Sequence, residues 1–120
     1  MDNKLIIHLE DEMSPKMIFR HFFNKKGYTV LDFSDSSEAN EANKYADAKV
    51  IVSDFDMRGE NALSMLRFLQ DNNISTPVIM HSANRSNYDL IKQKGLDKNV
   101  VMWADKNGML KDIFDKIETL

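Results

Sequence analysis

The sequence predicts an α/β protein with a doubly wound parallel sheet whose two faces are covered by helices. Five short apolar runs of strand length, rich in valine and isoleucine, alternate with longer segments that have helical spacing. The runs are apolar at consecutive positions, which is typical of strands buried on both faces. Regular alternation of strands and helices favours right-handed crossovers and hence a single parallel sheet.

The composition agrees with a single domain that spans residues 1–120. Hydrophobic residues make up 42% of the chain, which is enough for a core at this length. The formal net charge is −3 with both signs scattered, so we expect no direct binding to nucleic acid. The lack of cysteine excludes disulfides and thiolate metal sites. No apolar run has the length of a signal peptide or a membrane span, so we expect a cytoplasmic protein without membrane contact.

The first predicted strand covers residues 4–9, and the helix after it covers residues 14–26. Ser14 before Pro15 has the pattern of an N-cap followed by proline in the first helical position. The apolar stripe of this helix contains Met17, Ile18 and Phe22, joined by Phe19 and Phe23. Gly27 ends the helix, because glycine adopts the left-handed conformation that closes many helices.

The remaining segments repeat this arrangement. Strands are predicted at residues 28–33, 49–53, 77–81 and 100–103, and helices at residues 60–71 and 107–120 among others. N-cap candidates are residues 34–36 and Ser86, and Gly95 ends the fourth helix. The apolar sides of the two helices contain Leu63, Leu66, Phe68 and Leu69 in one and Leu110, Ile113, Phe114 and Ile117 in the other.

Polar side chains follow four of the five predicted strands. They are Glu10, Asp11 and Glu12 after the first strand, Asp54 and Asp56 after the third, Ser82, which precedes the small Ala83, after the fourth, and Asp105 and Lys106 after the fifth. Ligands of open parallel sheets bind beyond the carboxyl ends of the strands. We therefore expect carboxylates, a hydroxyl group and an amine to meet at one edge of the sheet.

This set of groups is suited to phosphoryl transfer. Carboxylates that lie close together repel each other, and a hard divalent cation such as Mg²⁺ relieves that repulsion. A carboxylate is also able to attack a phosphoryl group as a nucleophile. The phosphoryl oxygens then need positive charge and hydrogen-bond donors, which the metal, Lys106 and the Ser82 hydroxyl would supply.

Taken together, these segments resemble the receiver domains of two-component response regulators, including the small chemotaxis type. The resemblance is carried by residues 5–12, 50–57 and 77–83 and by Lys106, and it covers essentially the whole chain. It implies a flavodoxin-like (βα)5 fold with strand order 2-1-3-4-5. It also implies a signalling switch and not an enzyme, with at most slow self-dephosphorylation.

By this resemblance, Asp54 is the phosphoacceptor and Trp103 is an aromatic switch whose rotamer follows the state of the site. The implied Mg²⁺ ligands, for which Mn²⁺ is able to substitute, are Glu10, Asp11, Asp54 and the backbone carbonyl of Asp56. The residues implied to surround the phosphoryl group are Ser82, Ala83 and Lys106. The implied partners are a histidine kinase or histidine phosphotransfer protein, and a downstream protein or a second copy that contacts residues 84–120.

Three positions depart from the family pattern. Arg58 and Asn107 stand where proline is usual, and Ala62 stands where glycine is usual. Because a cis peptide bond rarely precedes a residue other than proline, we expect a trans bond before Asn107. The departures affect the geometry of loops and leave the chemical groups of the site in place.

Two other functions fit part of the pattern. Asp54 and Asp56 also resemble the nucleophile and acid/base pair of haloacid-dehalogenase-type phosphatases. That family normally carries its nucleophile on the first strand and has cap insertions, whereas here Glu10 and Asp11 come first in a short chain. The second alternative is a protein-binding module that is never phosphorylated. The departures in the loops favour this alternative, whereas the presence of all the site groups argues against it.

Ordinary structural roles are expected for several other residues. His8 and His81 lie on predicted strands, where a buried, hydrogen-bonded histidine is more common than a metal ligand. His21 is expected on a helix surface. Trp103 is equally well explained as a packed core aromatic.

Overall fold

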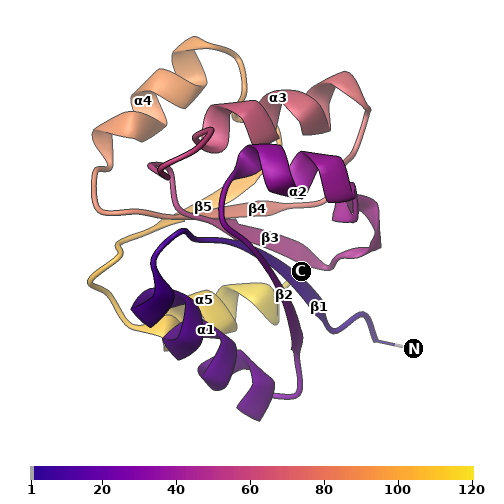
Figure 1. Ribbon diagram of the computed structural model, residues 1–120, viewed down its shortest axis with the longest axis vertical. Helices are drawn as coiled ribbons and strands as arrows, with labels where there is room; N and C mark the ends of the chain where they lie inside the picture. The colour runs from indigo at the N-terminus through magenta and orange to yellow at the C-terminus, as the bar shows by residue number, and fades with distance from the viewer. Residues whose placement is uncertain (1) are drawn as a thin grey trace.

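The structure is a computed structural model that describes residues 2–120, and it contains one five-stranded parallel sheet with helices on both sides (Figure 1). The strands are β1 (Leu5–Leu9), β2 (Thr29–Phe33), β3 (Val50–Ser53), β4 (Val78–His81) and β5 (Val100–Ala104). Their order is β2-β1-β3-β4-β5, and every neighbouring pair is parallel. The predicted doubly wound fold is confirmed, and each strand end lies within one residue of its predicted position.

Helices form a layer on each face of the sheet, as Figure 1 shows. One layer contains α1 (Met13–Lys25) and α5 (Leu110–Ile117). The other contains α2 (Ser36–Ala42), α3 (Ala62–Asp71) and α4 (Ser86–Gln93), with a 3-10 turn at Tyr45–Asp47 after α2. Within residues 2–120, no helix combines the length and the apolar character that a membrane crossing requires.

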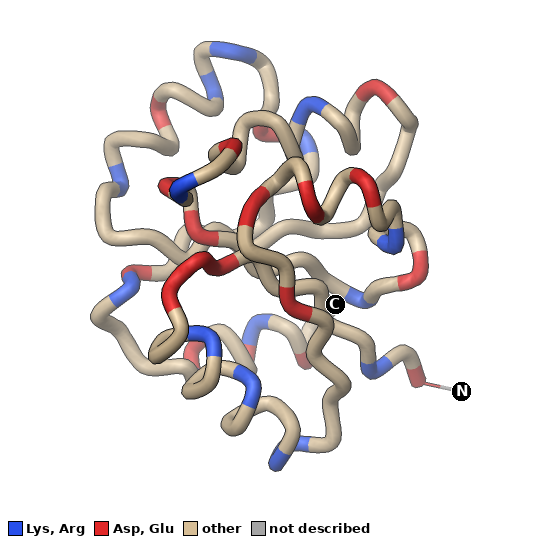
Figure 2. The backbone as a smooth tube through the Cα atoms, viewed as in Figure 1, with Lys and Arg blue, Asp and Glu red and all other residues tan. Residues whose placement is uncertain are grey.

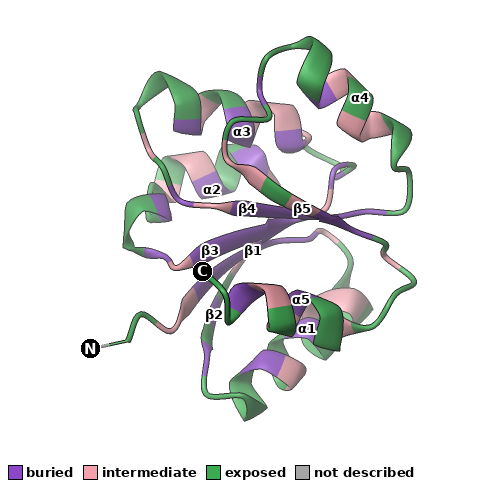
Figure 3. Cartoon of the chain, turned by 180° about the vertical axis from the view of Figure 1, so that it is seen from behind, coloured by how far each residue is buried: buried purple, intermediate pink, exposed green. Residues whose placement is uncertain are grey.

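The core is divided into two clusters by the sheet. Ile7 and Leu9 of β1 pack toward α2, α3 and α4, while Ile6 of the same strand packs toward α1 and α5. Successive residues of a strand point to opposite faces, so a strand covered on both sides must be apolar at consecutive positions. Figure 3 shows the resulting pattern of buried strands between helices whose outer sides are exposed.

The predicted start of the first helix is wrong. Glu12 is the N-cap of α1, with extended backbone angles and no capping hydrogen bond from its side chain, and Ser14 lies inside the helix. Pro15 is accordingly the third helical residue and not the first. Proline is tolerated there because the first N–H groups of a helix have no intrahelical acceptor.

The predicted apolar stripe of α1 is only partly correct. Phe19 and Phe23 are buried with their ring centroids 4.5 Å apart. In contrast, 61% of Met17 and 63% of Ile18 are exposed, and Phe22 is half-buried. Each residue turns the helix by about 100°, so a stripe centred on the i, i+4 pair of phenylalanines leaves their neighbours on the solvent side.

Other helix ends agree more closely with the sequence. Asp35, within the predicted capping segment, accepts a hydrogen bond from Glu38 N at 2.9 Å and begins α2. Ser86 is the first residue of α4 and not its cap, which is Arg85. Gly27 and Gly95 have φ angles of +88° and +68°, which confirms the left-handed helix ends. The last helix begins later than predicted, because a turn over residues 105–108 precedes it, and it ends at Ile117.

Candidate functional site

The loops that follow β1 and β3 form one acidic edge of the sheet. Figure 2 shows the acidic segment after β1 beside the acidic residues that follow β3. Glu10, Asp11 and Asp54 each offer a carboxylate oxygen, and these oxygens lie within 4.8 Å of one another. The expected convergence of the first and third strand ends is therefore present in the structure.

Glu10 is the most deeply placed of the three carboxylates, with 1% of its surface exposed. Its Oε2 accepts a hydrogen bond from the backbone N–H of Glu12 at 3.1 Å, and its own backbone N–H donates to Phe33 O at 2.9 Å. A carboxylate this buried requires a cationic partner, since an unpaired buried charge is strongly unfavourable.

Lys106 supplies that positive charge from the end of β5. Its ammonium group donates hydrogen bonds to Glu10 Oε1 and to Asp54 Oδ2, the latter at 3.1 Å. Burial alone would lower the pKa of Lys106, but the hydrogen bond to Glu10 and the charges of Asp54 and Glu10 outweigh burial and raise it. Lys106 is therefore protonated and joins the first, third and fifth strand ends.

Asp54 has a fixed orientation at the end of β3. Its Oδ1 accepts a hydrogen bond from Phe55 N at 2.7 Å while Oδ2 faces Lys106. Its backbone N–H donates to Leu9 O at 3.0 Å, which continues the pairing of β3 with β1. The carboxylate is half-buried, so it remains accessible to a small reactant.

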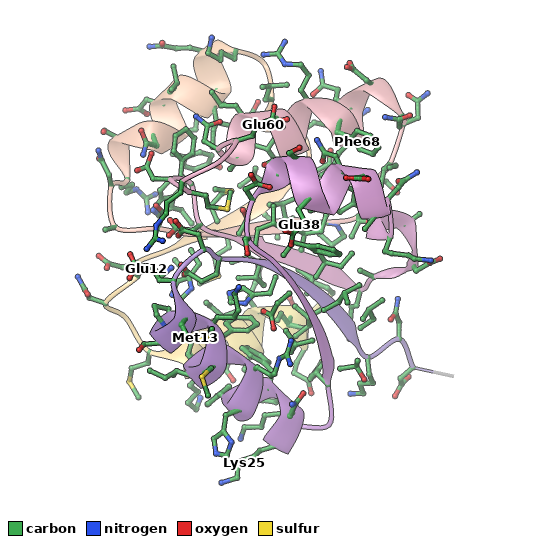
Figure 4. All side chains as sticks on the ribbon, in the orientation of Figure 1. Glu12, Met13, Lys25, Glu38, Glu60 and Phe68 are labelled. Atoms are coloured by element: carbon green, nitrogen blue, oxygen red, sulfur yellow. The ribbon has the colours of Figure 1, made fainter. Side chains whose placement is uncertain are left out.

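A cavity of about 320 Å³ opens beside Asp54. Its lining contains Glu12, Pro15, Asp54, Asp56, Ser82, Ala83, Asn84 and Lys106. Ser82 is buried and is held by a hydrogen bond from its backbone N–H to Ala104 O at 3.0 Å. Glu12, labelled in Figure 4, lies where the chain enters α1 at this edge of the sheet. The predicted residues from the third, fourth and fifth strand ends thus share one cavity.

The acidic group has the donor set that Mg²⁺ prefers. Magnesium takes oxygen ligands, keeps several waters and commonly uses only one or two carboxylates of a protein. Glu10, Asp11 and Asp54 provide such oxygens close together, and Asp56 lies in the same cavity. These residues therefore fit the hard divalent cation that the sequence predicts.

Arg58 is a neighbour of this group that the sequence did not reveal. Its backbone N–H donates to Asp11 Oδ2 at 3.0 Å, and its Nε lies 3.6 Å from the same oxygen. The contact joins residues 47 positions apart. It depends on the path of an irregular loop, for which the sequence carries no periodic signal.

Trp103 lies on β5 behind the cavity and does not line it. It is 9% exposed, and its indole stacks on Tyr88 of α4 with ring centroids 5.7 Å apart. The indole Nε1 is buried and has no hydrogen-bond partner within residues 2–120. Trp103 therefore packs against α4 and directly precedes Ala104, whose carbonyl accepts the hydrogen bond from Ser82 N.

His8 and His81 are buried and His21 lies on the surface, as predicted. His8 Nδ1 lies 2.8 Å from Asp32 Oδ1, and Arg20 Nε donates to Asp32 Oδ2 at 2.8 Å. Asp32 was not among the predicted functional residues, and its acidic side chain within an apolar strand is the signal that marks it. Burial lowers the pKa of His8 and, more than the nearby Lys106 charge, that of His81, which falls to about 4.

The peptide bond before Asn107 is trans, as predicted. The backbone N–H of Asn107 donates to Asp105 Oδ1 at 2.8 Å, and that of Gly108 donates to Asp105 O at 2.9 Å. Proline could not donate the first of these hydrogen bonds. The loop after Lys106 is thus a compact turn built around Asp105.

Solved structures resemble this chain over nearly its full length. A response regulator receiver protein from Pseudomonas putida is 15% identical, with a TM-score of 0.85 over 100% of this chain and 99% of that one. The Francisella response regulator 1452 receiver domain is 24% identical, with a TM-score of 0.82 over 98% and 95%. Chemotaxis response regulator CheY4 of Vibrio cholerae is 20% identical, with a TM-score of 0.81 over 98% of each chain. At these identities the likeness shows the fold alone.

The family follows from the sequence itself. Comparison with curated proteins gives no significant match. The family model of the response regulator receiver domain, in contrast, matches residues 6–118. Members of that family are signalling domains that accept a phosphoryl group, generally bind Mg²⁺ at an acidic site, and interact with histidine kinases and downstream effectors. The chain therefore belongs to the response regulator receiver domain family.

Proposed function

We propose that this chain is a phosphorylation switch in which Asp54 accepts a phosphoryl group from the phosphohistidine of a histidine kinase or phosphotransfer protein. The observation that carries the proposal is the position of Asp54, which lies beside two further carboxylates and Lys106 at the mouth of one cavity. Such a donor protein would meet this chain in the cytoplasm.

The nucleophile is the Asp54 carboxylate. A P–O bond to one of its oxygens forms as the P–N bond of the phosphoimidazole breaks, and the imidazole retains the electron pair of that bond. The hydrogen bond from Phe55 N orients the carboxylate before the reaction. Preorganisation of this kind lowers the barrier, because no reorientation is needed during transfer.

The surrounding residues stabilise the transferred group. Lys106 and the Ser82 hydroxyl contact its oxygens, and the small side chain of Ala83 leaves space for access. Glu10, Asp11 and Asp54, whose carboxylate oxygens lie together, would hold Mg²⁺ or Mn²⁺ with the help of the Asp56 carbonyl. When bound, this cation neutralises charge on the phosphoryl oxygens. Loss of the group occurs by slow self-dephosphorylation, without productive turnover of other substrates.

The signal leaves the site through the fourth and fifth strands. Phosphorylation adds negative charge at Asp54, which draws Lys106 and Ser82 toward the phosphoryl oxygens and favours one of two pre-existing conformations. Trp103 moves with Ser82, because the Ser82 backbone N–H is hydrogen-bonded to Ala104, the residue after Trp103. Its stacking partner Tyr88 belongs to α4, so the surface formed by residues 84–120 changes and binds a downstream protein or a second copy.

The proposal is tested by intact-mass spectrometry after incubation with acetyl phosphate and Mg²⁺. We expect the wild-type chain to gain one phosphoryl group and the Asp54→Asn variant to gain none. Asp56→Asn is the matched control, because it removes a carboxylate from the same cavity but keeps the backbone carbonyl.

Three results separate the functions considered. Labelling of Asp54→Asn would refute the assignment of the nucleophile. A wild-type chain that takes up no phosphoryl group would favour a binding module with the same fold. Rapid repeated hydrolysis of a phosphomonoester would favour a phosphatase.

A further inference from the structure

Arg58 contacts the carboxylate that the metal site needs. We propose that Arg58 competes with the divalent cation for Asp11 and thereby weakens Mg²⁺ binding in this chain. The inference rests on the proposed function, because it assumes that the acidic group holds such a cation. It concerns a residue outside the set of metal ligands and phosphoryl contacts described above.

The contact combines a backbone hydrogen bond and an ion pair on one oxygen of Asp11. The backbone N–H of Arg58 lies 3.0 Å from Asp11 Oδ2, and the guanidinium Nε lies 3.6 Å from it. The Asp11 side chain is mostly buried, whereas 84% of the Arg58 side chain is exposed. The guanidinium is therefore held mainly by this carboxylate and is free to swing into solvent when another cation takes its place.

The charges around the site are divided between two cations. Glu10 and Asp54 share the ammonium group of Lys106, while Asp11 has the guanidinium of Arg58. A divalent ion bound by Asp11 would lie beside that guanidinium, so it must either repel the guanidinium or displace it. Both cost free energy, and both lower the affinity of the site for Mg²⁺.

Proline, which the resemblance leads one to expect at this position, could make neither contact. It has no backbone N–H to donate and no positive charge. With Arg58 in its place, Asp11 already has a hydrogen-bond donor and a cationic neighbour before any metal arrives. The competition is thus a property of this sequence, and it requires no change in the metal ligands themselves.

The size of the expected change in Mg²⁺ affinity follows from the exposure of Arg58. Ion pairs with a solvent-exposed partner are weak and are screened by salt. Removal of the positive charge should therefore tighten Mg²⁺ binding by about two- to five-fold at low ionic strength. The gain should shrink as the salt concentration rises, because screening weakens the guanidinium in the wild-type chain.

The test is a calorimetric Mg²⁺ titration of the wild-type chain and three variants. Arg58→Gln removes the charge and keeps the backbone N–H, while Arg58→Lys keeps a positive charge. Arg67→Gln is the matched control, because it removes an exposed arginine from α3, away from the acidic group. We expect Arg58→Gln to lower the Kd by the stated factor at low salt, and the other two variants to remain close to the wild type.

Each result bears on a different part of the inference. An unchanged or raised Kd for Arg58→Gln would overturn it and leave the proposed function intact. An equal gain in Arg67→Gln would also overturn it, because net charge alone would then explain the effect. If neither the wild type nor any variant binds Mg²⁺, the metal site of the proposed function fails, and the role of Arg58 fails with it.

Discussion

Glu10 and Lys106 form an ion pair that stabilises the site and that, in the proposed switch, also takes part in signalling. Glu10 is almost fully buried, and an unpaired carboxylate there would cost on the order of several kcal/mol. Lys106 neutralises it and contacts Asp54 with the same ammonium group. Any new negative charge on Asp54 therefore acts directly on the group that stabilises Glu10. The pair that stabilises the resting site is also placed to detect phosphorylation.

His81 makes the stability of the protein depend on pH. Burial lowers its pKa to about 4 in the folded state, whereas an unfolded histidine titrates near 6.5. Between these values the unfolded chain binds a proton that the folded chain does not, so stability falls as the pH is lowered from about 6.5 to about 4. We expect this group to contribute a loss of roughly 3 kcal/mol over that window. His8, whose pKa is also lowered, acts in the same direction.

Urea denaturation at a series of pH values measures this effect. His81→Leu should flatten the decline between pH 6.5 and 4, whereas His21→Gln, at an exposed position, should leave the decline unchanged. The comparison uses the slope with pH, so a packing change that shifts stability equally at all pH values does not disturb it. An identical slope in His81→Leu and the wild type would contradict the role of His81.

The loop between β3 and α3 is held in place by the start of α2. Asp35 caps α2 through Oδ1 and accepts a hydrogen bond from Glu60 N through Oδ2 at 3.2 Å. Ser36 adds two more hydrogen bonds, from N to Glu60 O and from Oγ to Asn61 O. Figure 4 labels Glu38 and Glu60 at these two helix starts. This connection fixes the loop that carries Asp56 and Arg58.

Gly59 is required by this connection. A Cβ atom at Gly59 would lie 1.7 Å from Asp35 Oδ2, so any side chain would push the aspartate away from Glu60 and from its capping position. We expect Gly59→Ala to destabilise the fold by about 1–2 kcal/mol, the usual cost of a lost cap or of overpacking. Chemical denaturation of the purified variant measures the loss.

A double-mutant cycle identifies the cause. In an Asp35→Ala background the clash is gone, so adding Gly59→Ala should cost little. If the two substitutions are simply additive, Gly59 is not constrained by Asp35.

The strands and helices could be predicted because buried residues recur at regular intervals along each of them. Ile6 and Ile7 face opposite layers, which fixes a doubly covered strand from its consecutive apolar residues. Helix ends without a side-chain cap carry no such signal, and α1 begins at Met13 although Ser14 and Pro15 have the pattern of a start. The stripe of α1 was misplaced because its apolar residues cover more than one side of the helix. Only packing distinguishes the buried ones.

The candidate site was predictable to the extent that it follows from strand ends. Parallel strands bring their carboxyl ends to one edge, so Glu10, Asp54 and Lys106 meet whatever the loops do. The contact of Arg58 with Asp11 depends on the conformation of an irregular loop, and no periodicity reports it. The strand ends therefore bring the reactive groups together, and the loop, by our proposal, sets how tightly a metal would be held.

Across the whole molecule, adjoining strands connect the site to α4. Ser82 lines the cavity at the end of β4, and its backbone is bonded to β5 at Ala104. Trp103 precedes Ala104 and stacks on Tyr88 of α4. Every step is a direct contact, so a displacement of Ser82 has a continuous route to the surface of residues 84–120.

The proposed switch depends on which carboxylate receives the phosphoryl group. Reduction of the phosphorylated chain with borohydride converts an aspartyl phosphate to homoserine, and peptide mapping by tandem mass spectrometry then locates it in the unmutated protein. We expect homoserine at position 54 and at no other acidic position, and only when Mg²⁺ is present during phosphorylation. Homoserine at position 11 or 56, or labelling at position 54 that is indifferent to the metal, would contradict the switch described here.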